Sequence, residues 1–264
     1  RAGRMSCPRR AGNPLWSAYE IFAMLLGLGM LALLCLIWLP FALLLHALLP
    51  RRLGQPLGRQ AIMRGFRFYL GFLQVFCACR FELAELDRLR DAGPLIVAAN
   101  HPSLLDVVLI ASRLPNAVCV IKAALLDRLL FGAAARLAGY IRNDAPLEMI
   151  LQARAELRAG AQLVIFPEGS RTAGFPLDPF APGCGLLAWR AKTPVQTLLI
   201  EFSTPYLGKA WPLFRRPPLP LHCRIRLGRR FPPPADHAAF TRELEACFRV
   251  ELSQNTASTA TGAA

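Results

Sequence analysis

Residues 94–114 read PLIVAANHPSLLDVVLIASRL, an apolar run, a short polar segment and a second apolar stretch. The first run, LIVAA, is typical of a buried strand because it is short, apolar and followed by a turn signal. The stretch LLDVVLIASRL has the composition of a helix that covers a sheet, and Pro102 suits the first turn of that helix. The segment therefore predicts a strand that ends at His101 and is followed at once by a helix.

The same alternation continues along the chain. Further short β-prone runs are separated by helical stretches such as PLEMILQARAELRAG, and the runs are AVCVIK, LVIFPEG and VQTLLIEF. This rhythm predicts an α/β fold with a mostly parallel central sheet flanked by helices. Residues 212–220 are too rich in proline for a regular element, whereas LHCRIRLG indicates a late strand and ADHAAFTRELEACFRVEL a closing helix.

Residues 21–50 contain no Asp, Glu, Lys or Arg. As one helix they would extend about 45 Å, against about 30 Å for the hydrocarbon core of a bilayer, so the segment must tilt, bend or double back. Pro40 divides it, and arginines stand on both sides of it, so the flanking charge does not choose an orientation. A membrane-embedded helix and a re-entrant helical hairpin both fit. A cleaved signal peptide is disfavoured because the run is too long.

The composition also indicates a membrane. The chain is 54% hydrophobic and 18% charged, with a mean hydropathy of +0.36, whereas soluble domains carry about 25% charged residues. The formal net charge of +14 suits anionic lipids or phosphorylated substrates. Nucleic acid is disfavoured because the basic residues are spread along the chain. The eight cysteines have no zinc-like spacing and indicate reduced thiols facing the cytosol.

The sequence divides into five segments. Residues 53–80 interleave Arg with aromatic and aliphatic side chains, which favours an amphipathic helix on the membrane surface. An ordinary helix packed under the catalytic domain is the alternative. The expected organisation is a basic N-terminal segment (1–20), a membrane anchor (21–50), an interfacial helix (51–80), a catalytic domain (81–252) and a disordered tail (253–264).

His101 and Asp106 are the first candidates for chemistry. Ligands bind at the carboxyl edge of open α/β sheets, which is where the strand before His101 ends. An Asp one turn into the following helix can bind one imidazole nitrogen and fix the tautomer, and the other nitrogen can then take a proton from a substrate hydroxyl. Taken alone, a His near an Asp is more often a cap or a satisfied hydrogen bond.

A second polar segment supports the catalytic interpretation. Residues 162–172 read QLVIFPEGSRT, an apolar strand followed by a tight turn. Gly169 permits unusual backbone angles or close ligand approach. Glu168 can accept hydrogen bonds from a polyol, and Arg171 can bind a phosphate with two hydrogen bonds. The alternative is a charged turn with an internal Glu–Arg pair.

Together, NHPSLLD (100–106) and FPEGSR (166–171) resemble two blocks of the glycerolipid acyltransferase family, whose bacterial archetype is the 1-acyl-sn-glycerol-3-phosphate acyltransferase. The resemblance covers roughly residues 75–205. It implies that His101 is the general base, that Asp106 is its partner, and that no metal is needed. It also implies a set of substrate-binding residues: Asn100, Ser103, Lys122, Arg142, Glu168, Gly169, Ser170 and Arg171.

Two departures from the family pattern affect the acceptor side. Where relatives often read PxxP, residues 194–197 are Pro-Val-Gln-Thr, and Pro182 replaces a basic residue that often precedes a glycine. These departures leave the chemistry intact. They put in doubt a simple lysophosphatidate substrate.

The expected function is therefore O-acyl transfer at a membrane. The resemblance implies a fatty acyl group carried by acyl-CoA or acyl-carrier protein as co-substrate, no other cofactor, and a lysophosphatidate-like lipid as acceptor. The expected location is a bacterial inner membrane, with the catalytic domain on the cytoplasmic face. Three alternatives remain: a relative that uses a lyso-aminolipid or polyene-type acceptor, a thioester hydrolase, and a non-enzymatic membrane-binding protein.

Overall fold

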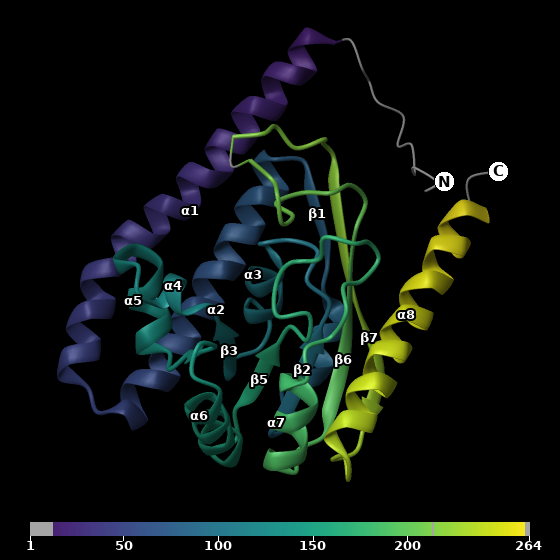
Figure 1. Ribbon diagram of the computed structural model, residues 1–264. Helices are drawn as coiled ribbons and strands as arrows, with labels where there is room; N and C mark the ends of the chain where they lie inside the picture. The colour runs from purple at the N-terminus through teal and green to yellow at the C-terminus, as the bar shows by residue number, and fades with distance from the viewer. Residues whose placement is uncertain (1–12, 213, 262–264) are drawn as a thin grey trace.

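The computed structural model describes residues 13–212 and 214–261, with side chains described as far as Ser253. A central sheet is covered by helices on both faces, and a long N-terminal helix runs along one side (Figure 1). The strands are β1 (Cys79–Glu82), β2 (Leu95–Ala99), β3 (Ala117–Ile121), β4 (Ile141–Arg142), β5 (Gln162–Ile165), β6 (Val195–Phe202) and β7 (Leu221–Phe231). The α-helices are α1 (Pro14–Leu48), α2 (Arg51–Phe76), α3 (Asp106–Ala111), α4 (Ala123–Leu126), α5 (Leu129–Leu137), α6 (Pro146–Arg158), α7 (Gly183–Ala191) and α8 (His237–Thr261), and η1 (Ala84–Leu89) is a 3₁₀ helix.

The seven strands lie in the order β1-β7-β6-β2-β5-β3-β4. Every neighbouring pair is parallel except β6 and β7, which are antiparallel. The predicted α/β fold with a mostly parallel sheet is therefore confirmed. Strands β1 and β4 stand at the two edges, and their four and two residues are too short to give a sequence signal.

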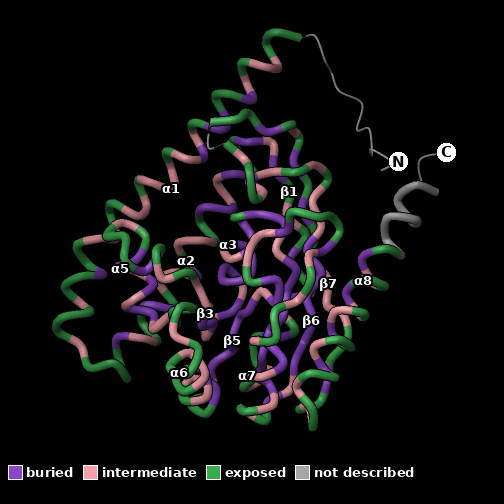
Figure 2. Tube along the Cα trace, in the orientation of Figure 1, coloured by how far each residue is buried: buried purple, intermediate pink, exposed green. Residues whose placement is uncertain are grey.

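Strand β2 shows how the sheet divides the core. Leu95, Val97 and Ala99 pack into a cluster with residues of α2 and α3, whereas Ile96 and Ala98 pack into a second cluster with residues of α6, α7 and α8. Successive strand residues point to opposite faces, so a strand that is buried on both faces reads as an unbroken apolar run. Figure 2 shows this burial along the central strands.

The N-terminal apolar segment forms one helix rather than a hairpin. Helix α1 has 35 residues, and it continues through Pro40. Its length is about 52 Å at 1.5 Å per residue. Many of its large apolar side chains are exposed, including Phe22, Ile37 and Phe41. Among the described residues, α1 is the helix long and apolar enough to cross a membrane.

Helix α2 lies within the segment expected to form an interfacial helix, and one of its faces packs against the domain. At Gly58, an added Cβ would lie 2.9 Å from atoms of Leu137 and Ala138, so the glycine permits close contact with the end of α5. Leu53 and Phe68 are exposed on α2. The helix therefore has features of both expected arrangements. It packs under the domain, and it also exposes apolar side chains as an interfacial helix would.

The C-terminal end of the chain differs from the sequence expectation. Helix α8 continues to Thr261, where the sequence predicts a disordered tail from residue 253. Most of the basic segment 1–20 lies outside the described residues, including Arg9 and Arg10. The seven cysteines in the described part of the chain are free thiols.

Candidate active site

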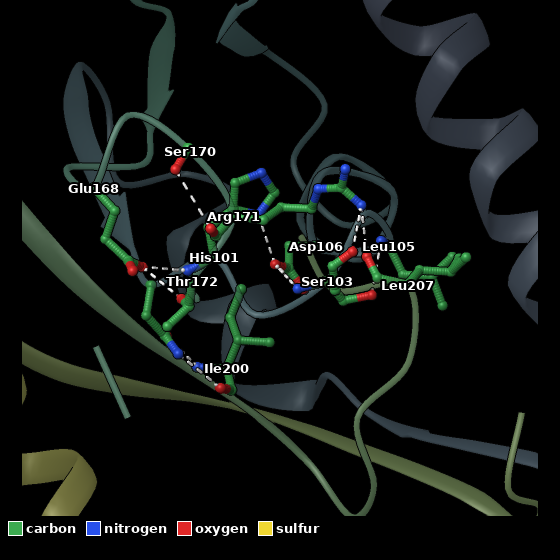
Figure 3. A network of polar contacts seen from close by, with 12 residues as sticks. His101, Ser103, Leu105, Asp106, Glu168, Ser170, Arg171, Thr172, Ile200 and Leu207 are labelled. Atoms are coloured by element: carbon green, nitrogen blue, oxygen red, sulfur yellow. Dashed lines mark hydrogen bonds and ion pairs between the residues drawn. The ribbon is translucent and has the colours of Figure 1, made fainter. Parts of the chain in front are cut away.

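Two neighbouring parallel strands bring the two sequence motifs together. Strands β2 and β5 pair with Ala98 opposite Ile165, so the segments that follow them leave the sheet at the same edge. His101 follows β2, and the turn that carries Glu168 and Arg171 follows β5. Figure 3 shows these side chains gathered at this edge. The site therefore depends on strand order as well as on the motifs themselves.

His101 and Asp106 form a hydrogen-bonded pair. The distance from His101 Nδ1 to Asp106 Oδ2 is 2.7 Å, and the same oxygen accepts the Ser103 N–H at 2.8 Å. An ionised carboxylate is an acceptor only, so Nδ1 carries the proton and Nε2 keeps a lone pair. Within the described residues, Nε2 has no hydrogen-bond partner. The His101 side chain is 14% exposed, so Nε2 is available as a base.

Asp106 is placed differently from the sequence expectation. It is the first residue of α3 rather than one turn inside the helix. Residues 102–105 form a turn, and the Asp106 carboxylate closes that turn through the Ser103 N–H. The aspartate thus shapes the same turn that fixes its distance to the imidazole.

The Asp106 carboxylate is fully buried. Burial raises its pKa to about 6, although hydrogen bonds from His101 and Ser103 act in the opposite direction. Its second oxygen, Oδ1, has no hydrogen-bond partner among the described residues. A buried carboxylate with so few donors is poorly solvated, and in its ionised form it attracts a neighbouring positive charge strongly.

Two residues that sequence analysis did not assign to the site hold His101 in place. The Phe166 ring stacks on the imidazole, with centroids 3.9 Å apart and planes 17° apart. The Thr172 N–H donates to the His101 carbonyl at 2.7 Å. Phe166 is the first residue of FPEGSR, and Thr172 directly follows the motif, so both could have been found by their place in or next to it.

Glu168 is bonded to its own chain on both carboxylate oxygens. Oε1 accepts the His101 N–H at 2.8 Å and the Thr172 hydroxyl at 2.9 Å, and Oε2 accepts the Asp178 N–H at 2.9 Å. Burial raises the pKa of this carboxyl. Glu168 thus ties the turn after β5 to the residue that follows β2.

Asn100 and Ser103 are corrections to the predicted substrate-binding set. Asn100 is 3% exposed, and its side chain donates to the Ile200 carbonyl at 2.9 Å and accepts the Ile200 N–H at 2.8 Å. Ser103 is fully buried, and its hydroxyl accepts the Leu105 N–H at 3.2 Å. Both side chains bind backbone, so they shape the site and do not face a substrate.

Arg171 reaches away from the imidazole towards a distant loop. Its Nη1 donates to the carbonyls of Leu207 and Gly208, at 2.8 and 2.9 Å. Gly169 has φ +69°, a backbone conformation that favours glycine, and the Ser170 hydroxyl donates to the Arg171 carbonyl at 3.4 Å. No motif or periodicity in the sequence predicts that Leu207 and Gly208 hold Arg171.

Lys122 and Arg142 lie outside this polar network. Lys122 directly follows β3, which is two strands away from β2 in the sheet. Arg142 is the last residue of β4, which is three strands away. Strands are about 4.8 Å apart, so these residues lie about 10 and 14 Å along the edge from the strand that positions His101. Arg142 is paired with Asp127 and Asp144 on the surface. Their role in substrate binding stays a prediction.

At the carboxyl edge of the sheet, a histidine–aspartate pair therefore lies beside a turn that carries a glutamate and an arginine. Residues 80–201 match the family model described as Acyltransferase.

Curated relatives and a solved structure are similar to this chain. The chain is 29% identical over 155 residues to human 1-acyl-sn-glycerol-3-phosphate acyltransferase beta, covering 56% of this chain and 53% of the relative. It is 27% identical to the 1-acyl-sn-glycerol-3-phosphate acyltransferase of Helicobacter pylori, covering 47% of this chain and 57% of the relative. The chain thus spans about half the length of these relatives.

The crystal structure of the 1-acyl-sn-glycerophosphate (LPA) acyltransferase PlsC from Thermotoga maritima superposes with a TM-score of 0.67. The superposition covers 90% of this chain and 98% of that one at 17% identity, and it shows a shared fold.

Proposed function

We propose that this protein transfers a fatty acyl group from a thioester to the free hydroxyl of a lysophosphatidate-like glycerolipid. The supporting observation is the His101 imidazole, which is bonded through Nδ1 to buried Asp106 at 2.7 Å and has Nε2 without a partner among the described residues. A neutral imidazole in this arrangement can remove a proton from a hydroxyl. The named relatives are 1-acyl-sn-glycerol-3-phosphate acyltransferases, which favours that acceptor.

In the proposed mechanism, the acceptor hydroxyl approaches His101 Nε2. Nε2 takes the hydroxyl proton as the oxygen attacks the thioester carbonyl carbon, and the imidazolium that forms is stabilised by the Asp106 carboxylate. The tetrahedral intermediate then collapses, the carbon–sulfur bond breaks, and Nε2 returns the proton to the leaving thiolate. The products are an ester and a free thiol, with acyl-CoA or acyl-carrier protein as donor. His101 ends the cycle in its starting state, and no other cofactor takes part.

Arg171 is the proposed contact for the acceptor phosphate. Its Nη1 is engaged by two carbonyls, while Nε and Nη2 have no partner among the described residues. A guanidinium fixed at one nitrogen can still present two parallel N–H groups to a phosphate. Glu168 contributes by holding the His101 backbone, and a contact with the acceptor polyol would add to its three existing hydrogen bonds.

The proposed place of reaction is a membrane surface. The exposed apolar side chains of α1 are suited to hydrocarbon. Helix α2 exposes four of its five arginines and has no acidic residue, which suits anionic lipid head groups. A thioester and a lipid acceptor could then meet at the bilayer without the acyl chain crossing water. Attachment to the cytoplasmic face of a bacterial inner membrane is part of this proposal.

The test is a transfer assay in purified membranes with a labelled acyl thioester and a panel of lyso-acceptors. His101→Ala should lower transfer by about 10²- to 10⁴-fold, the range for removing a general base. His222→Ala is the matched control, because His222 is exposed on β7 and paired with Glu82. Wild-type transfer by His101→Ala would contradict the mechanism.

The acceptor panel tests the substrate. Arg171→Ala should raise the Michaelis constant for a phosphorylated acceptor, and an unchanged constant would argue against phosphate binding. Preference for a lyso-aminolipid would show that the acceptor is not lysophosphatidate. The departures from the family pattern at Pro182 and residues 194–197 are compatible with such an acceptor. Donor hydrolysis without a rise in acylated lipid would indicate a thioesterase.

A further inference from the structure

The loop between β6 and β7, residues 203–220, joins the candidate site to the long N-terminal helix. Figure 1 shows this loop crossing from the end of the sheet to α1. Its base is closed by the Ser203 N–H, which donates to the His222 carbonyl at 2.8 Å, and by the His222 N–H, which donates to the Ser203 hydroxyl at 3.0 Å. We refer to residues 203–220 as the bridging loop.

At the site, the bridging loop holds the guanidinium of Arg171. The Leu207 carbonyl accepts both Arg171 Nη1, at 2.8 Å, and the Leu104 N–H, at 3.1 Å. Leu207 is buried and has φ +51°. A non-glycine residue in this left-handed region costs about 1–2 kcal/mol, so the surrounding contacts must impose the conformation. The place of Arg171 therefore depends on how this loop is held.

At its other end, the bridging loop is bound to Glu20 of α1. Glu20 is the single charged residue between Pro14 and Leu48, and it is 9% exposed. Its carboxylate accepts the Leu219 N–H at 3.2 Å and lies 3.5 Å from Arg216 Nη1. A buried carboxylate in an apolar helix is costly unless it is paired, so an ionisable residue there indicates a specific role.

Contacts inside the bridging loop connect these two ends. The Trp211 N–H donates to the Gly208 carbonyl at 3.2 Å, and its ring packs edge-on against Tyr206 with centroids 5.8 Å apart. The Trp211 indole N–H donates to the Arg215 carbonyl at 3.2 Å, and the Arg215 guanidinium lies 4.5 Å from the ring centroid. These contacts link Arg215, the neighbour of Arg216, through Trp211 to Gly208.

We propose that Glu20 is a positioning residue for acceptor binding: it anchors the bridging loop to α1, and the loop fixes Arg171 where the acceptor phosphate binds. This inference rests on the proposed acyltransferase function. It gives the apolar helix a part in substrate recognition in addition to membrane attachment. It also predicts that loosening the anchor weakens acceptor binding more than it slows the chemistry, because the side-chain hydrogen bonds of His101 and Asp106 in the described part of the chain lie within residues 101–106.

The test compares Glu20→Ala with Glu20→Gln and with Tyr19→Phe. Glu20→Ala should raise the acceptor Michaelis constant about tenfold, equivalent to ~1.4 kcal/mol, with kcat and the donor constant changed by less than about twofold. Glu20→Gln keeps an oxygen for the Leu219 N–H and should restore most of the affinity. Tyr19→Phe removes a hydrogen bond from α1 to the Phe76 carbonyl of α2, without touching the loop, and should leave the acceptor constant unchanged.

An equal fall in kcat, or an equal effect of Tyr19→Phe, would show general loosening of α1 and overturn the proposal. An unchanged acceptor constant in folded Glu20→Ala would also overturn it. If Glu20→Ala does not fold, Arg216→Met removes the ion pair and keeps the Leu219 N–H bond, so it should raise the acceptor Michaelis constant by about as much as Glu20→Gln does, again with kcat unchanged. An acceptor constant unchanged in both variants would overturn the proposal.

A readout without activity separates this proposal from the proposed function. Trypsin can cut after Lys209 and Arg215, both in the bridging loop. Cleavage there should be faster in Glu20→Ala than in the wild type or Tyr19→Phe. If Glu20→Ala is cleaved faster but the wild-type protein transfers no acyl group, the anchor is supported and the acyltransferase function is rejected. Unchanged cleavage would reject the anchor whatever the activity.

Discussion

Replacing Asp106 with Asn should abolish most of the activity and leave the fold at least as stable. Asp106 is fully buried, and burial raises its pKa from 3.8 to about 6. A shift of about two pKa units means that the ionised form costs the folded state about 3 kcal/mol at pH 7, at ~1.4 kcal/mol per unit. Asn removes that cost. Its amide group would stand in the place of Oδ1, which has no partner in the described residues, and an unpaired donor there costs about 1–3 kcal/mol. The net change in the free energy of unfolding should therefore lie between about 0 and +2 kcal/mol.

The pH dependence gives the sign of this effect. Because the folded-state pKa is raised, the proton on Asp106 stabilises the wild type below pH about 4, and this stability is lost as the pH rises through about 6. Asp106→Asn has no such proton. The stability of the variant relative to the wild type should thus increase from pH 4 to pH 7. Thermal unfolding in detergent measures this, and ~1 kcal/mol corresponds to about 2–4 °C for a chain of this size.

Although Asp106→Asn should not lower the stability, it should lower the activity. Asn cannot stabilise the imidazolium as a carboxylate does, and it can hold the imidazole in the wrong tautomer, so kcat should fall by about 10²- to 10⁴-fold. Asp236→Asn is the matched control, because Asp236 accepts backbone N–H groups at the start of α8, far along the chain from the site. A stable Asp106→Asn protein with wild-type kcat would refute the role of the carboxylate. A loss of more than about 2 kcal/mol in stability would refute the electrostatic reasoning.

Three further predictions concern the pH dependence of activity, one backbone support of the site, and a buried ion pair between α2 and α6. In the wild type, kcat should fall as the pH falls through about 6, because protonated Asp106 no longer stabilises the imidazolium; a pH–rate profile measures this, and a flat profile down to pH 5 would contradict it. Asn100→Ala should lower the free energy of unfolding by about 2–5 kcal/mol, because it leaves the buried Ile200 N–H and carbonyl unpaired; an unchanged melting temperature would show that water replaces the side chain. Arg59→Met should cost about 3–5 kcal/mol by stranding Glu156, which lies 2.6 Å from the Arg59 guanidinium, and the double variant Arg59→Met/Glu156→Gln should recover part of that loss in the same melting assay.

The sequence predicts which side chains gather at the site better than it predicts the backbone contacts that hold them in place. The runs that became β2 and β5 are unbroken and apolar because both faces of these strands are buried, and their motifs follow directly. The parallel arrangement then brings His101 and Glu168 to one edge. A polar residue in such a motif gives the same sequence signal whether it binds substrate or backbone. The partner of Asn100 is Ile200, on a strand whose place beside β2 is set by the whole fold.

Strand order also explains why the predicted positive charges do not converge. Lys122 and Arg142 follow apolar runs, as His101 does, so the sequence treats all three as strand-end residues. In the sheet, β3 and β4 are separated from β2 by β5. The number of strands between two residues is a property of tertiary packing, and local periodicity carries no information about it.

The two halves of the site are held by different parts of the chain. His101 is fixed by residues of NHPSLLD and FPEGSRT, which are close to each other through two paired strands. Arg171 is fixed by the bridging loop, which is in turn bound to α1. The loop also accepts the Leu104 N–H, but it takes no part in the hydrogen bond between His101 and Asp106. We therefore expect changes in the loop or in α1 to affect the proposed acceptor site more than the imidazole and its carboxylate. The bridging loop is also rich in proline, and its sequence has no regular pattern, so acceptor specificity is the property that the motifs predict least.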